Sequence, residues 1–169
     1  MLFNKLTLFT AFVLAFAATG FCKVTNKTVA VESDSRFCLL LPPYPCTYVS
    51  DNLDRSISFC TSGISDIPNA KTFPDDFIQS AHYLKQTDRY VQVTGRIDRR
   101  EYGLHSDDSG GQNDPKHPVG ALCRNYPYFV QFIEPNDNIY CLRCCKNRSD
   151  CPIDRSGEGC RAVIGGNYD

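Results

Sequence analysis

The chain has 169 residues, ten cysteines, no tryptophan and a formal net charge of −1, and this length fits a single domain with its own hydrophobic core. With 18 basic against 19 acidic side chains it offers no strongly basic face, which argues against nucleic acids and anionic membranes as partners. Ten cysteines are too few to replace a core at this length, so disulfides are expected to reinforce one.

Residues 1–20 have the pattern of a secretory signal peptide. Lys5 precedes an apolar run, Leu6–Ala18, which is broken only by two threonines. The run is too short to cross a bilayer of about 30 Å, so a membrane anchor is the weaker interpretation. Cleavage after Gly20 would leave ten cysteines and cleavage after Cys22 nine, and the even number favours the first site. The sequence therefore predicts a secreted protein, extracellular or associated with the cell wall.

Residues 21–35 form a polar N-terminal segment, and residues 36–169 have the pattern of a β-rich domain. Two tripeptides match the acceptor pattern for N-glycosylation, one at Asn26 in the polar segment and one at Asn147 among the C-terminal cysteines. Because both lie in polar surroundings of a chain predicted to be secreted, we expect at least one of them to carry a glycan.

A short strand is predicted at Leu39–Leu41, where an apolar run ends at the prolines of the sequence PPYP. A second strand is predicted at Ser56–Cys60. The prolines between them are expected to form a rigid corner held by Cys38 and Cys46. The alternative is a polyproline ligand for a partner domain, which is less favoured because such ligands normally lie in disordered tails.

Apolar and polar side chains alternate along Tyr90–Ile97, which predicts a half-buried strand. Phe77–Leu84 is rich in aromatic and aliphatic residues and is expected to pair with it as an antiparallel hairpin. We expect His82 in this first strand to be packed or solvated, not a ligand or a base. Gly95 in the second strand indicates a bulge or a close backbone approach.

Asp98–Gly120 has few apolar residues, and segments this long without regular structure are often functional. Its carboxylates and histidines are numerous enough to bind a metal, but their spacing fits neither an EF-hand nor an HExxH motif. A solvated loop in which Asp and Gly build turns is therefore favoured, and no metal or cofactor is expected. The residues expected to contact a ligand here are Tyr102, His105, Asp107, Asp108, Gln112 and Asp114.

Tyr126–Glu134 has apolar residues on both faces and is predicted to be a central strand. Ile139–Cys144 is predicted to return as a strand, and Arg161–Gly166 to contain a last short strand. No repeat and no extended helical periodicity is present. The predicted fold class is an all-β or β-rich small single domain of antiparallel strands stapled by disulfides.

The cysteines are expected to form disulfides. Zinc ligation by Cys141, Cys144, Cys151 and Cys160, the first two of which have CxxC spacing, is less favoured because thiols pair in an oxidising secretory compartment. A redox-active CxxC would need a helix N-terminus in a βαβ unit. Cys144 and Cys145 point to opposite faces of an extended segment, so they should join different partners and hold two layers together. The pairing stays open for all ten cysteines: Cys22, Cys38, Cys46, Cys60, Cys123, Cys141, Cys144, Cys145, Cys151 and Cys160.

The chain resembles a family of fungal secreted, cysteine-rich proteins of unknown biochemical activity, some of which are labelled macrophage-activating glycoprotein-like. The resemblance lies in the segments FCLLLPP, FCTSG, FIQSAHYLKQTDRYVQVTGRID, EYGLHSDDSGGQ, YFVQFIEP, YCLRCC and GCRAVIGG. It implies an extracellular fungal protein, wall-associated or host-facing, and brings no catalytic residues with it. Cys22 and Cys46 depart from the family pattern, and an added bridge between them is expected.

Two functional hypotheses follow. The first is a non-catalytic, effector-like protein that binds a cell-wall polysaccharide or a host surface component through exposed tyrosines such as Tyr102 and the polar groups of residues 98–120. The absence of tryptophan counts against it. The second is a polysaccharide hydrolase that uses two carboxylates. Carboxylates in polar loops are usually only solvated, so the binding protein is preferred. The carboxylates considered for hydrolysis are Asp98, Asp107, Asp108 and Glu134.

Overall fold

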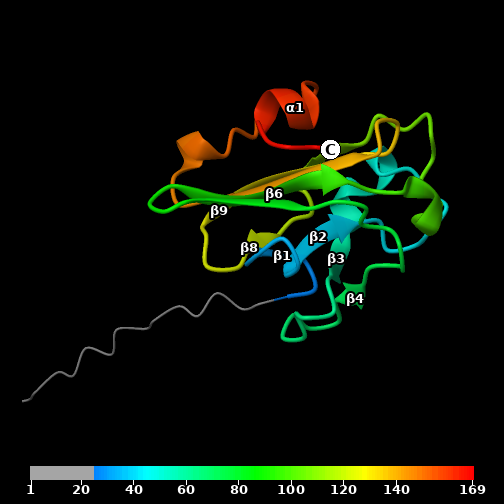
Figure 1. Cartoon of the computed structure of the whole chain (residues 1–169), viewed down its shortest axis with the longest axis horizontal. Helices are drawn as coiled ribbons and strands as arrows, with labels where there is room; N and C mark the ends of the chain where they lie inside the picture. The colour runs from blue at the N-terminus through cyan, green and yellow to red at the C-terminus, as the bar shows by residue number, and fades with distance from the viewer. Residues whose placement is uncertain (1–24) are drawn as a thin grey trace, which may run out of the picture.

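The computed structural model describes residues 25–169, and the predicted signal peptide, its cleavage sites and Cys22 lie outside the described residues. Within this range the chain forms two five-stranded sheets, with three short 3-10 helices and one short α-helix (Figure 1). Every pairing between named strands is antiparallel except those of β1 with β8 and of β3 with β4. The predicted β-rich class is confirmed.

The first sheet has the strand order β4-β3-β2-β1-β8, and the second has the order β5-β6-β10-β9-β7. The strands of the first sheet are β1 (Thr28–Val31), β2 (Phe37–Leu41), β3 (Ile57–Cys60), β4 (Lys71–Thr72) and β8 (Leu122–Cys123). The strands of the second sheet are β5 (His82–Gln86), β6 (Tyr90–Arg96), β7 (Gly111–Asn113), β9 (Tyr128–Glu134) and β10 (Ile139–Cys145). Both strands predicted around the proline corner and the returning strand at residues 139–144 are thus confirmed.

The main hydrophobic core lies between the two sheets. Leu39 of the first sheet and Phe129 and Ile133 of the second are completely buried there, and each such side chain contributes about 1.5–3 kcal/mol relative to full exposure. On β9 the alternate residues Val130 and Phe132 point the other way, into a second core on the outer face of the sheet. The strand predicted to be apolar on both faces is therefore an interior strand with both faces covered.

The predicted hairpin exists, but with a shifted first strand. β5 covers His82–Gln86 instead of Phe77–Leu84, and Phe77 is fully buried before the strand begins. His82 is half-buried, and its ring Nε2 lies 2.8 Å from a terminal oxygen of Asp169. A Cβ at Gly95 would lie 2.1 Å from the carbonyl oxygen of Ser80. The close backbone approach predicted for this glycine is confirmed.

The last strand predicted at the C-terminal end is wrong. Residues Gly159–Val163 form the short helix α1, which covers the outer face of the second sheet (Figure 1). The apolar run in this segment is too short for its periodicity to separate strand from helix. Val163 and Ile164 pack into the second core, and the Ile164 N–H donates to the Cys160 carbonyl at 2.7 Å. Within residues 25–169 there is no helix with the length and apolarity needed to cross a membrane.

Four disulfides connect eight of the nine described cysteines. The prediction for the adjacent pair on β10 is confirmed, because Cys144 faces the main core and Cys145 the second core. Cys144 bonds Cys123 and so joins the two sheets, while Cys145 bonds Cys151 in the C-terminal segment. The disulfide interpretation thus holds, in place of zinc, for these eight cysteines: Cys38–Cys60, Cys123–Cys144, Cys141–Cys160 and Cys145–Cys151.

The proline corner is held differently from the prediction. Cys38 pairs with Cys60 across β2 and β3, and Cys46 is exposed with no cysteine partner among residues 25–169. Tyr102 holds the corner instead: its hydroxyl donates to the Pro42 carbonyl at 2.9 Å, and its own carbonyl accepts from the Cys46 N–H at 3.3 Å. A hydrogen-bonded tyrosine therefore replaces the expected pair of cysteines.

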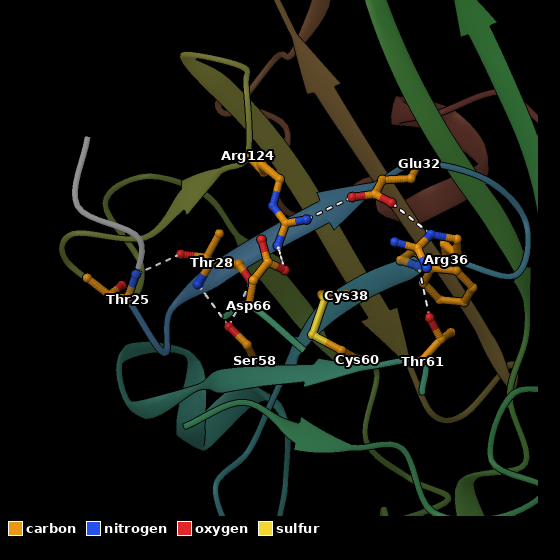
Figure 2. Close-up of polar contacts among 11 residues, drawn as sticks. Thr25, Thr28, Glu32, Arg36, Cys38, Ser58, Cys60, Thr61, Asp66 and Arg124 are labelled. Atoms are coloured by element: carbon orange, nitrogen blue, oxygen red, sulfur yellow. Dashed lines mark hydrogen bonds and ion pairs between the residues drawn. A yellow bond between two sulfur atoms is a disulfide. The ribbon is translucent and has the colours of Figure 1, made fainter. Parts of the chain in front are cut away.

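Polar side chains tie the β1, β3 and β8 parts of the first sheet together (Figure 2). The Ser58 hydroxyl lies 2.8 Å from the nitrogen and 2.7 Å from the oxygen of Thr28, and so satisfies both backbone groups. Arg124 follows β8 and forms ion pairs with Glu32 and Asp66, both at 2.7 Å. Its side chain is only 15% exposed. The two ion pairs of Arg124 hold the end of the parallel β8 strand at the edge of the sheet.

Candidate functional site

The segment predicted to be a solvated loop contains regular structure and contacts both sheets. Arg99–Tyr102 forms the 3-10 helix η2, which begins where the Asp98 carboxylate accepts the Arg100 N–H at 3.0 Å. Gly111–Asn113 forms β7, the edge strand beside β9. The expected ligand-contacting residues of this segment are therefore distributed over several environments.

Tyr102 is buried, so the prediction of an exposed contact tyrosine is wrong. Its side chain is 7% exposed, and its ring meets those of Phe59 and Phe77 edge to face. Burial raises the pKa of Tyr102 to about 12. The sequence pattern missed this because the partners lie in the first sheet and in the proline corner, far away in the chain.

Asp108 is also buried and acts as a structural anchor. One carboxylate oxygen accepts the N–H of Val49, and the other accepts the N–H of Gly110 at 2.8 Å. Its backbone carbonyl accepts the N–H of Asn136 at 3.0 Å. With 2% of its surface exposed, Asp108 connects three segments and offers no surface to a ligand.

His105 and Asp107 meet at the surface around Tyr48. The His105 ring stacks on that of Tyr48 with centroids 4.1 Å apart, and the Tyr48 hydroxyl lies 3.2 and 3.1 Å from the two Asp107 oxygens. The hydrogen bond to Asp107 is the main reason that the pKa of Tyr48 is raised. Tyr48 was not predicted as a site residue, because nothing in its local sequence separates it from other tyrosines.

Gln112 and Asp114 line a cleft of about 830 Å³. One wall is the 3-10 helix η1 (Ser50–Arg55), and β7 with the turn that follows it forms the floor. Residues 153–157 contribute the opposite wall. The cleft is therefore assembled from three segments that are distant in the sequence, and we take it as the candidate site.

Gln112 is held rigidly in the floor of the cleft. Its Nε2 donates to Asp114 Oδ2 at 2.8 Å and to the Ile153 carbonyl at 3.0 Å. These two acceptors fix the orientation of the amide, since the flipped amide would set oxygen against oxygen. Its Oε1 is buried and has no hydrogen-bond partner within the described part of the chain. An unpaired buried acceptor costs about 1–3 kcal/mol until a donor reaches it.

Charged groups surround this amide. Asp114 is 2% exposed, and its second oxygen accepts the N–H of Lys116 at 2.7 Å. At the rim, His117 Nδ1 lies 2.8 Å from Asp54 Oδ1, and both side chains are more than half exposed. Asp54, Lys116 and His117 were not predicted as site residues, because only the fold brings η1 beside the turn after β7.

Two disulfides position the wall opposite η1. The segment from Cys151 to Cys160 is tied at its start by the bond of Cys151 to Cys145 and at its end by the bond of Cys160 to Cys141. Both partners belong to β10, the central strand of the second sheet. The wall that contains Gly157 is thus anchored to the sheet that carries the floor.

The four carboxylates considered for hydrolysis lie in different surroundings. The hydrogen bond and charge of Arg100 lower the pKa of Asp98 to about 2. Asp107 bonds Tyr48, and both oxygens of Asp108 accept backbone N–H groups. Glu134 Oε1 accepts the N–H of Cys160 at 2.7 Å, and burial raises its pKa, partly offset by this bond. In residues 25–169 no three His, Cys, Asp or Glu side chains converge as metal ligands.

Two curated fungal proteins from Mycosarcoma maydis are similar to the chain. It is 29% identical to Appressorium protein ROW1 over 164 residues and 30% identical to Appressorium protein ROW2 over 169 residues. These alignments cover 85% and 87% of the chain but 37% and 56% of the relatives, so the chain spans roughly a third to a half of their length. No family model and no solved structure matches it. The similarity supports a fungal protein related to appressorium proteins, and the relatives' names say nothing of macrophage activation.

Proposed function

We propose that this protein is a secreted, non-catalytic fungal protein that binds a cell-wall polysaccharide in the cleft beside β7. The observation that carries the proposal is the rigid Gln112 amide, whose buried Oε1 lacks a donor in the described chain. The relation to appressorium proteins and the four disulfides support an extracellular, effector-like role.

A sugar hydroxyl both donates and accepts hydrogen bonds, and it suits a site that presents both kinds of group. The exposed Asp54 carboxylate and Lys116 ammonium offer an acceptor and a donor at the rim, and the buried Gln112 Oε1 is an acceptor that lacks a donor in the described chain. Leu53 and Ile153 add apolar surface for the C–H faces of a sugar ring. The described lining of the cleft contains no Phe, Tyr or Trp, so affinity here would rest mainly on hydrogen bonds and not on stacking of a sugar on such a ring.

The test is co-sedimentation of the purified secreted protein with insoluble chitin, β-glucan or mannan. Pelleted protein and released reducing ends are measured in the same tube. Binding to one polymer without sugar release is the expected result. If none of the polymers retains the protein, the proposal is overturned.

A double variant tests whether the cleft is the binding surface. Asp54→Ala with Lys116→Ala removes two exposed groups at the rim, where substitutions change stability by about 0.5 kcal/mol or less. The matched control is Asp75→Ala with Lys85→Ala, since both residues are exposed and lie outside the cleft. We expect the first variant to bind the polymer several-fold more weakly and the control to bind like the wild type. Equal binding by both would place the site elsewhere.

A hydrolase is the second candidate function, and the raised pKa of Glu134 is the observation that favours it. Burial raises the pKa of Glu134, and a carboxyl group with a raised pKa keeps its proton to a higher pH, as a general acid requires. The co-sedimentation experiment distinguishes the two functions, because it measures pelleted protein and released reducing ends in the same tube. If reducing ends appear, and Glu134→Gln abolishes them, the protein is an enzyme and the non-catalytic proposal is wrong.

A further inference from the structure

Two hollows of the surface meet beside Gly157. The cleft at Gln112 is the larger, and a second hollow of about 340 Å³ lies beside Glu134. Both are lined by the same four residues where they adjoin, namely Gly110, Gly111, Ser156 and Gly157. The two hollows therefore adjoin at these four residues.

We propose that the two hollows form one groove that binds an extended polysaccharide chain across Gly157. Different sugar units of the same chain then contact the Gln112 end and the Glu134 end. This inference rests on the proposed function and deepens it, because it assigns the ligand as the interior of a polymer and not as a chain end or a single sugar.

Glycines keep the crossing point open. A Cβ at Gly110 would lie 1.7 Å from the Ile133 carbonyl oxygen, so the backbone of this wall lies directly against β9. Across the groove, a Cβ at Gly157 would meet no atom within 4 Å. Three of the four shared lining residues are glycines, so Ser156 alone among them carries a side chain that could narrow the junction of the hollows. Because the Gly157 wall is tied to β10 by two disulfides, the junction is a fixed feature of the fold.

The second hollow offers hydrogen-bonding groups of the same kind as the first. Glu134 uses Oε1 to accept the Cys160 N–H, and Asn136, Asp137 and Arg161 also line the hollow. Donors and acceptors are therefore present at both ends of the groove. A hydroxyl-rich chain finds partners along such a surface, whereas an extended peptide would need pockets for alternate side chains.

The test uses glycine substitutions that the fold tolerates. Gly157 has open space around its Cβ position and no positive φ, so Gly157→Leu fills the junction without strain. Gly165 has the same freedom and lies outside both hollows, which makes Gly165→Leu the matched control. Unchanged thermal unfolding and unchanged disulfide masses for both variants establish that the fold is intact.

The measurement is the dissociation constant for short and long oligosaccharides of the polymer that the protein binds. For the wild type and for Gly165→Leu, we expect about tenfold or greater gain in affinity from short to long fragments, equivalent to about 1.4 kcal/mol. Gly157→Leu should bind short fragments like the wild type and lose that gain.

The outcomes separate this inference from the proposed function. One contrary result is that Gly157→Leu keeps the full gain in affinity with fragment length; another is that the wild type binds short and long fragments equally. In either case the ligand occupies one hollow, so the inference of a continuous groove is wrong while the proposed function stands. If a generic extended peptide, and no oligosaccharide, binds in a manner blocked by Gly157→Leu, the groove is a peptide site. If the wild type binds no polysaccharide at all, both proposals are overturned.

Discussion

The side-chain amide of Gln131 on β9 hydrogen-bonds both backbone groups of Leu40 on β2. Gln131 Oε1 accepts the Leu40 N–H at 2.8 Å, and Gln131 Nε2 donates to the Leu40 carbonyl at 2.8 Å. The paired residues of β1 and β2 include Ala30 with Cys38 and do not extend to Leu40. A side chain of the second sheet thus takes the place of a neighbouring strand, in the middle of the apolar core between the sheets.

Replacing Gln131 by leucine should destabilise the fold strongly. Gln131→Leu leaves the Leu40 N–H and carbonyl unpaired in a dry core, at a cost of about 1–3 kcal/mol for each group. Urea unfolding measures the loss. The control is Gln79→Leu at an exposed position, which should stay within about 0.5 kcal/mol of the wild type. Equal stability of the two variants would contradict this role of Gln131.

The four disulfides should differ in their contribution to stability. The bond between Cys123 and Cys144 spans 21 residues, and the bond between Cys145 and Cys151 spans only 6. In the chain-entropy account, removing the disulfide that closes the longer loop by paired Cys→Ala substitutions lowers the free energy of unfolding by about 3 kcal/mol. Removing the disulfide that closes the shorter loop lowers it by about 2 kcal/mol. Thermal unfolding of the two double variants checks this order. A reversed order would show that native-state packing around the bonds outweighs loop entropy.

Substitution of Asp108 should affect stability, not ligand affinity directly. Asp108→Ala removes the acceptor of the Val49 and Gly110 N–H groups, and the buried N–H groups left behind cost about 1–3 kcal/mol each. The exposed neighbour Asp107 provides the comparison, because Asp107→Ala leaves no buried group unpaired. Denaturant midpoints measured for both variants give the result. If Asp107→Ala destabilised the protein as much as Asp108→Ala, the role of Asp108 as a structural anchor would be contradicted.

Glu134 should make stability depend on pH in a defined direction. Burial raises its pKa in the folded protein, so the folded state holds a proton that the unfolded chain has already released. The free energy of unfolding contributed by this group therefore falls as pH rises from the ordinary glutamate range, about 4.3, through the raised pKa. Glu134→Gln keeps an acceptor for the Cys160 N–H and does not titrate, so its stability relative to the wild type should increase across that window.

Unfolding experiments at a series of pH values test the predicted contribution of Glu134 to stability. Glu101→Gln is the control, because Glu101 is exposed. The stability difference between Glu134→Gln and the wild type should rise with pH and then become constant. A difference that is independent of pH would mean that Glu134 has the same pKa in the folded and unfolded chain.

Local pattern was enough to predict the strands that are packed on one or two faces. The alternation along Tyr90–Ile97 and the doubly apolar Tyr126–Glu134 both became strands of the second sheet. The opposite directions of Cys144 and Cys145 followed from strand geometry alone. The helix at Gly159–Val163 was missed because five residues held in place by a disulfide and by packing show no helical period.

The candidate site was less predictable, because its walls come from distant parts of the chain. Gln112 and Asp114 were identified by residue type within a polar segment, and both line the cleft. The local sequence of Tyr102 made it an equally good candidate for ligand contact. Tyr102 is nevertheless buried by contacts with Pro42 and Phe59. Residue type indicates what chemistry a side chain can supply, but burial depends on tertiary contacts that a single sequence does not reveal.

Three of the four described disulfides have one cysteine on β10, and two of them close the segment that carries Gly157. All six of these cysteines are buried, and disulfides of this kind persist in the oxidising surroundings outside the cell. Reduction would release one wall of the groove from the central strand, even if most of the two sheets stayed folded. For the binding proposed for this groove, adding a reductant should therefore abolish binding before it unfolds the two sheets.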